Sequence, residues 1–197
     1  MKKKLLSLPK FNFLKTTSEI PSCSTLIYYG AMPITQFYAH RYKFPYKQAP
    51  YHAAFHIEKG RTLQVGKFET LQRVSADFTE KRRIDVIEYL HIPYDVKEKI
   101  IEDAYDDVDK PHWGYNKLNY SVFDFLRFEP LIRWAIPRSS KQICSEDTGE
   151  RYNKFQYPVA SRPNPKLEIA PWDLAMWAFD NPSKCRIFTI WQGKDFK

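Results

Sequence analysis

The segment from Tyr51 to Lys67 constrains the fold more than any other, because it predicts a β-hairpin. The apolar run HAAFHI is followed by the turn-forming residues EKG, and strand-like alternation resumes in RTLQVGK. Two strands joined by a three-residue turn that contains a glycine are typical of a hairpin. Further strands are predicted at Ser24–Tyr29, which a glycine follows, and at Cys185–Trp191.

The rest of the chain predicts a mixture of strands and helices. Phe68–Phe78 fits a third strand or an edge segment, and Lys81–Leu90 fits a helix as well as a strand. Helices are predicted at Tyr94–Tyr105, with Asp95 as the N-cap, and at Pro171–Phe179, which opens on its proline. The fold class is therefore α+β, with a central, mostly antiparallel sheet of about five or six strands packed against helices.

The composition supports one folded domain. The chain has 197 residues, of which 43% are hydrophobic and 16% aromatic, so it can bury a core of its own. We expect a single domain over 25–197, preceded by an irregular, partly extended arm over 1–24. Neither GxGxxG nor GxxxxGK[ST] occurs in the sequence, which argues against the common nucleotide-binding loops.

The net charge of +8 suits a partner or surface with negative charge, such as phosphates, an anionic cell wall or an anionic membrane. The basic residues are scattered, and their densest clusters are Lys2–Lys4 and Lys81–Arg83. A nucleic-acid-binding domain, with Trp113 and Tyr115 as stacking residues, is therefore an alternative function only.

The sequence also bears on location. No apolar run approaches the roughly 20 residues of a membrane span. The basic N-terminus lacks the long apolar stretch and small-residue cleavage site of a secretory signal. The expected location is the cytoplasm of the producing cell, or a virion.

One of the three cysteines has a distinctive setting. The three are widely spaced and form no CxxC pair, which argues against a zinc knuckle or a thioredoxin-type site. Cys144 is followed by Ser145 and Glu146, and this pattern predicts a helix from Cys144 to about Tyr152 or Phe155. The unpaired N–H groups and the dipole of a helix start lower the pKa of a thiol. The alternative interpretation is a small buried residue, as many free cysteines are.

A nucleophilic cysteine needs a base, and the hairpin supplies candidates. His52 begins the first strand, and Gln64 on the second strand is a candidate for the polar group that orients the imidazole. Pairing around the turn would place these two residues roughly opposite each other, and they would meet Cys144 if both side chains face its helix. His56 lies four residues after His52, on the same side of the strand, and either supports His52 or is the base itself. The alternative is a sheet face with two buried imidazoles.

Four aspartates, Asp103, Asp106, Asp107 and Asp109, have the spacing of a loose metal-binding loop. The glycine and the terminal glutamate of an EF-hand are missing, so we expect a solvated turn without a metal ion. No other group of residues predicts a metal or a cofactor.

The histidine strand, the hairpin and a later Cys-Ser-Glu string, in this order, resemble the circularly permuted NlpC-type papain-like hydrolases. That group includes the YiiX-like and the lecithin:retinol acyltransferase-like proteins. Their catalytic histidine precedes the cysteine and begins a strand written H-x-G-[IV]-x-[IVL]. A polar residue follows about twelve positions later, where this chain has Gln64, although Ala54 replaces the glycine. The resemblance covers about residues 25–195.

The resemblance implies a permuted papain-like fold and a thiol mechanism. Cys144 would attack an amide or ester carbonyl and form a thioester, with His52 as the base. The backbone N–H of Cys144 would be one oxyanion donor, and Tyr120 would give further support. The implied substrates are cell-wall peptides and acyl amides or esters, and no cofactor is implied.

The leading interpretation is therefore a cysteine peptidase or amidase with a peptide, cell-wall or acyl substrate. One alternative is a catalytically inactive structural or binding protein on the same fold, such as a phage or envelope component. The other is the basic nucleic-acid-binding domain.

Overall fold

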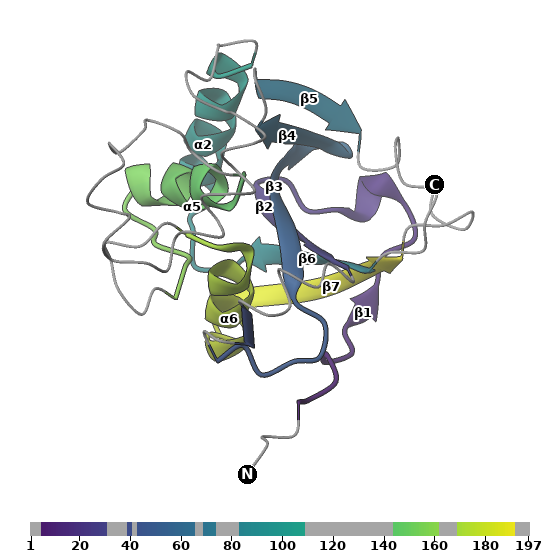
Figure 1. The fold of residues 1–197 in the computed structure, drawn as a ribbon. Helices are drawn as coiled ribbons and strands as arrows, with labels where there is room; N and C mark the ends of the chain where they lie inside the picture. The colour runs from purple at the N-terminus through teal and green to yellow at the C-terminus, as the bar shows by residue number, and fades with distance from the viewer. Residues whose placement is uncertain are drawn as a thin grey trace.

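A computed structural model describes seven ranges of the chain, which form a sheet with helices on one face (Figure 1). The ranges are 5–30, 39–40, 43–65, 69–73, 83–108, 144–161 and 169–191.

The sheet has seven strands in the order β1-β7-β6-β2-β3-β4-β5. Their bounds are β1 (Asn12–Phe13), β2 (Ser24–Tyr29), β3 (Pro50–Glu58), β4 (Arg61–Val65), β5 (Glu69–Arg73), β6 (Arg83–Tyr89) and β7 (Cys185–Trp191). Neighbouring strands are antiparallel, except that β1 runs parallel to β7. The mostly antiparallel α+β fold is thus confirmed. It has one strand more than predicted, because the N-terminal arm contributes β1.

Three helices and one short 3-10 turn complete the described fold. These are η1 (Thr17–Glu19), α2 (Tyr94–Asp106), α5 (Cys144–Lys154) and α6 (Pro171–Asp180). The helix predicted to open at Pro171 is confirmed, and a helix is present over the predicted Cys144 segment, while the residues before Cys144 lie outside the described ranges. The predicted N-cap of α2 is wrong, because Pro93 takes that position. Asp95 lies instead in the first turn, where its charge suits the positive end of the helix dipole.

The ambiguous segment Lys81–Leu90 contains a strand. Its central part, β6, pairs with β2 on one side and with β7 on the other. A strand paired at both edges and covered on both faces has few solvent-facing positions, and six of its seven residues are buried. Such a run lacks the polar alternation that marks a half-exposed strand, which explains why the sequence pattern is ambiguous.

The β3–β4 hairpin is confirmed, but its turn is shorter than predicted. Glu58 pairs with Arg61, so the turn consists of Lys59 and Gly60 alone. Both have a positive φ, 48° and 73°, as a type I′ turn requires. A side chain at Gly60 would also lie 2.6 Å from the Cβ of Thr17, so the arm packs closely against the turn.

Side chains of β3 alternate between two cores. Ala53, Phe55 and Ile57 belong to the core that α2, α5 and α6 cover, and the ring of Tyr152 on α5 meets that of Phe55 at 5.8 Å. Ala54 belongs to the core on the opposite face.

That second core is closed by the N-terminal segment. Leu26 and Tyr28 of β2 lie in it, and Ile20 and Leu14 pack against them from outside the sheet. Figure 1 shows the three helices on one side of the sheet and the purple N-terminal segment on the other. The segment predicted as an irregular arm therefore belongs to the folded unit.

Candidate functional site

The first turn of α5, which carries the candidate nucleophile, is anchored to the segment before α6. Cys144 is the first residue of α5. Ser145 is buried, and its hydroxyl donates a hydrogen bond of 2.7 Å to the carbonyl of Ile169. Gly149 lies so close to Ile169 that a Cβ there would approach its side chain to 2.3 Å. Ser145 and Gly149 thus fix α5 against the segment before α6.

The far end of α5 is fixed to α2 through Arg151. The Arg151 guanidinium contacts Asp107 at 2.9 Å, Asp103 at 3.3 Å and Asp147 at 3.3 Å. Its side chain is only 3% exposed, and it lies 5.6 Å from the ring centre of Phe55.

The expectation of a solvated aspartate turn is therefore wrong for Asp103 and Asp107, which are half-buried ion-pair partners of Arg151. Asp106 is exposed, and Asp109 lies outside the described residues. Within the described ranges, no three side chains of the His, Cys, Asp or Glu type gather as metal ligands.

His52 lies on the face of the sheet away from α5. It pairs across the strands with Tyr28, and the two ring centres are 5.1 Å apart. Tyr28 belongs to the core under the N-terminal segment, whereas Phe55 faces α5. The condition under which His52 would meet Cys144, that its side chain faces the helix, is therefore not met. Alternation along β3 gives the helix face to Ala53 and Phe55, so His52 must take the other face.

His56 is fully buried and holds the hairpin turn. Its Nδ1 lies 2.9 Å from the carbonyl oxygen of Pro21, and the N–H of Gly60 donates to its Nε2 at 3.0 Å. Because Nε2 accepts, the ring proton is on Nδ1 and is donated to Pro21. Burial lowers the pKa of His56 to about 4. The imidazole is therefore neutral near pH 7, with both nitrogens engaged in structure.

Gln64 lies on β4, where it pairs with Thr70 of β5. On its other side the register joins Phe55 to Leu63. One further step of this register places Gln64 opposite Ala54, two residues from His52. Other predicted site residues, Tyr120, Trp113 and Tyr115, lie outside the described residues.

The other two cysteines are structural. Cys23 and Cys185 are buried, and burial raises their pKa values to about 12 and about 11. The thiol of Cys185 donates to the carbonyl of Ala178 at 3.2 Å. A buried neutral thiol is a poor nucleophile, so the thiol hypothesis depends on Cys144.

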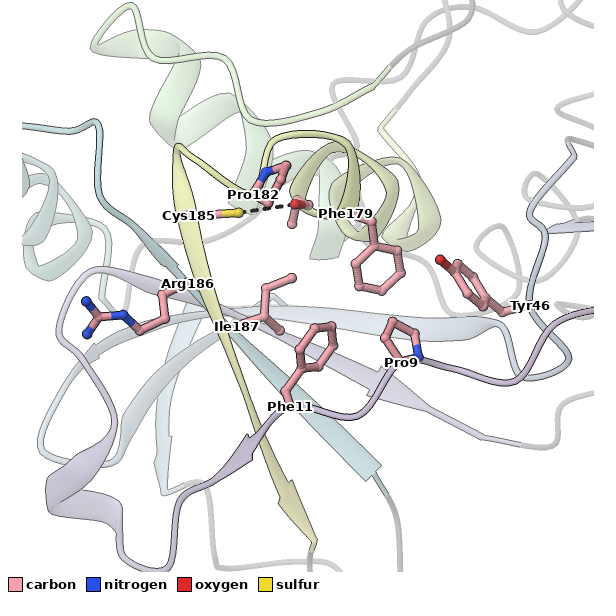
Figure 2. Close-up of a pocket in the computed structure, with 9 residues that line it drawn as sticks. Pro9, Phe11, Tyr46, Phe179, Pro182, Cys185, Arg186 and Ile187 are labelled. Carbon is pink, nitrogen blue, oxygen red and sulfur yellow. Dashed lines mark hydrogen bonds between the residues drawn. The ribbon is translucent and has the colours of Figure 1, made fainter.

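A pocket that the sequence analysis did not predict lies between the N-terminal arm, the end of α6 and the start of β7. It has a volume of about 400 Å³. Its lining consists of Pro9, Phe11, Tyr46, Ala178, Phe179, Pro182, Cys185, Arg186 and Ile187. In Figure 2 the rings of Phe11, Phe179 and Tyr46 gather with Pro9 and Ile187, whereas the guanidinium of Arg186 points away from them.

Aromatic contacts connect the walls of this pocket. The ring centre of Phe179 on α6 lies 6.0 Å from that of Phe11 on the arm and 5.3 Å from that of Tyr46. These residues are far apart in the sequence, so no local pattern of residues predicts the pocket. Phe11 lies in the N-terminal arm, which the sequence analysis predicted to be irregular and partly extended.

A buried ion pair holds the arm beside this pocket. The Asp85 carboxylate accepts hydrogen bonds from Arg83 at 2.8 and 2.9 Å and from the Thr189 hydroxyl at 2.8 Å. Arg83 also donates to the carbonyl of Pro9 at 2.7 Å, and its guanidinium lies 5.6 Å from the ring centre of Phe11. Burial raises the pKa of Asp85 against the opposing effect of Arg83.

None of the helices in the described ranges has the length and apolar character needed to cross a membrane. Comparison with protein-family models, with curated proteins and with solved structures finds no match to this chain.

Proposed function

We propose that the chain is a binding protein whose ligand occupies the pocket between the N-terminal arm, α6 and β7. The observation that carries this proposal is the pocket itself. Its volume of about 400 Å³ lies in the range typical of small-molecule sites, and its walls combine aromatic rings with aliphatic side chains. The sequence analysis offered a catalytically inactive structural or binding protein as an alternative to the hydrolase, and a small-molecule site is a new form of that binding alternative.

The lining favours a small, uncharged ligand with an aromatic or branched apolar body. Arg186 is the one charged residue among those that line the pocket. Its guanidinium points away from the aromatic walls and lies 3.7 Å from the Glu88 carboxylate (Figure 2). A charged ligand would lose hydration in the pocket without a facing ion partner, which is unfavourable.

The test is a titration of the folded protein with indole, followed by the backbone amide signals of the pocket residues in NMR spectra. We expect saturable shifts at Ala178 and Ile187, which the variant Ile187→Trp abolishes by filling the pocket. Leu90→Trp, at a position that is 47% exposed and does not line the pocket, is the matched control and should bind indole as the wild type does. Absence of shifts in the wild type, or their persistence in Ile187→Trp, would refute the proposal.

A cysteine hydrolase of the permuted papain-like type, acting as a peptidase or amidase through Cys144, is our second proposal. Its support is the position of Cys144 in the first described turn of α5, together with the helix start that the sequence predicts there, since helix N–H groups favour a thiolate. The placement of His52 on the opposite face of the sheet weighs against the predicted base.

Alkylation by iodoacetamide against pH separates the two proposals. Cys23 and Cys185 are buried with raised pKa values, so alkylation of the folded protein reports on Cys144. We expect His52→Ala to leave the midpoint unchanged, because a sheet separates His52 from α5. A midpoint well below the free-thiol value of about 8.5 that rises in His52→Ala would instead support the hydrolase. His91→Ala is the matched control for loss of an imidazole elsewhere.

A further inference from the structure

We propose that Arg83 is a positioning residue that holds the N-terminal arm as one wall of the pocket. Arm docking and ligand binding then stabilise each other. This inference rests on the proposed binding function, and it concerns how the site is assembled.

The backbone attachment of the arm near the pocket is short. The strand β1 pairs with β7 at only two positions, Asn12 with Phe188 and Phe13 with Thr189. Further toward the N-terminus, Leu6 exchanges hydrogen bonds with the segment around Tyr46. The pocket-lining residues of the arm lie between these two attachments, and there Arg83 donates to the carbonyl of Pro9.

Contacts outside the arm fix the orientation of Arg83. Two nitrogens of the guanidinium bind both carboxylate oxygens of Asp85 in a bidentate pair, and Thr189 holds the same carboxylate from β7. A planar guanidinium held in this way presents its remaining donors in fixed directions. One of its nitrogens reaches Pro9 at 2.7 Å, while its face lies near the ring of Phe11.

The arm residues that Arg83 contacts are the ones that line the pocket. Pro9 and Phe11 form its arm-side wall, and Phe11 stacks with Phe179 on the α6 side (Figure 2). A ligand in the pocket therefore touches both the arm and the body of the domain. Coupling between two binding events is reciprocal, so a ligand that stabilises the docked arm must bind less tightly when the arm is released.

Cleavage after Lys10 by endoproteinase Lys-C measures arm release. Lys10 is exposed and lies between the two pocket-lining arm residues. Extended chain must leave the surface before a protease can accept it. Lys99 lies in α2, so its cleavage reports unfolding of the helix and serves as the internal control. The fragments are quantified by mass spectrometry with and without indole.

We expect Arg83→Met to speed cleavage after Lys10 by roughly tenfold or more, because the arm loses a charge-assisted hydrogen bond. Cleavage at Lys99 should change little. The double variant Arg83→Met, Asp85→Asn removes the unpaired buried carboxylate and should show the same effect if the single variant is unstable. Arg61→Met is the matched control, because Arg61 is exposed on β4 and does not line the pocket, and it should cleave as the wild type does.

Indole should slow cleavage after Lys10 in the wild type. Arg83→Met should weaken indole binding by a factor similar to the factor by which it speeds cleavage after Lys10. Unchanged cleavage in both Arg83 variants would overturn the role of Arg83. Faster cleavage with unchanged indole affinity would overturn the coupling. If indole does not bind the wild type, the binding proposal and the coupling fail, while the cleavage data without indole still decide whether Arg83 holds the arm.

Discussion

At the scale of single residues, the two histidines of β3 show how one sequence pattern supports two different environments. His56 is enclosed by Pro21, Gly60 and the hairpin, whereas His52 is half-buried beside Tyr28. The sequence places both imidazoles on one side of the strand, and the structure agrees. The sequence does not reveal which side of the strand faces a helix, because that depends on packing between distant segments.

The buried state of His56 predicts a loss of stability in mild acid. Its pKa is about 4 in the folded protein against 6.5 for the free group, so the unfolded chain binds the proton more readily. The contribution of neutral His56 is complete above about pH 6.5 and is lost as the pH falls toward 4, by about 3 kcal/mol in all.

Urea unfolding at about pH 7.5 and at about pH 4.5 measures this loss. In His56→Gln the group no longer titrates, so the variant should lose less stability between the two pH values than the wild type. An equal loss in both proteins would show that other groups cause the acid sensitivity.

At the scale of elements, α5 carries the candidate nucleophile, and its presence was predictable. A helix over the Cys144 segment follows from the local order of apolar, thiol and helix-starting residues, and the structure confirms that helix. The partners of α5 were not predictable. Arg151 meets aspartates of α2 that stand more than forty residues earlier in the sequence, and no local spacing encodes that contact.

The position of Arg151 predicts that it stabilises the packing of α5 on α2. Arg151→Met leaves Asp103, Asp107 and Asp147 close together without their shared cation. Removal of one partner from a largely buried ion pair costs about 3 kcal/mol. Urea denaturation followed by circular dichroism measures the change in the free energy of unfolding.

Lys154→Met is the matched control, because Lys154 also contacts Asp103 but its side chain is 61% exposed. Exposed ion pairs contribute less than about 1 kcal/mol, so this variant should unfold close to the wild type. Equal effects of the two substitutions would contradict the structural role assigned to Arg151.

At the scale of the whole molecule, the sequence predicts individual strands and helices better than the way they pack together. Ser24–Tyr29 and Cys185–Trp191 are strands with the predicted bounds, because each is a compact apolar run. The pocket joins residues from Pro9 to Ile187, and the two-residue strand β1 is too short to leave a periodic signal. These features arise only when the first and last described strands of the chain, β1 and β7, come together.

The place of β7 within the sheet has a consequence for how the protein is made. This strand is the last of the described elements in the chain, yet it lies between β6 and β1 and pairs with both. The other strands therefore leave the ribosome before β7. During that time β6 lacks one of its two neighbouring strands, and β1 of the N-terminal arm lacks the strand with which it pairs. Pairing across such separations makes folding slow, and an unpaired strand edge attracts other chains in the meantime. Until β7 has left the ribosome, β6 therefore keeps one open edge at which another chain could pair.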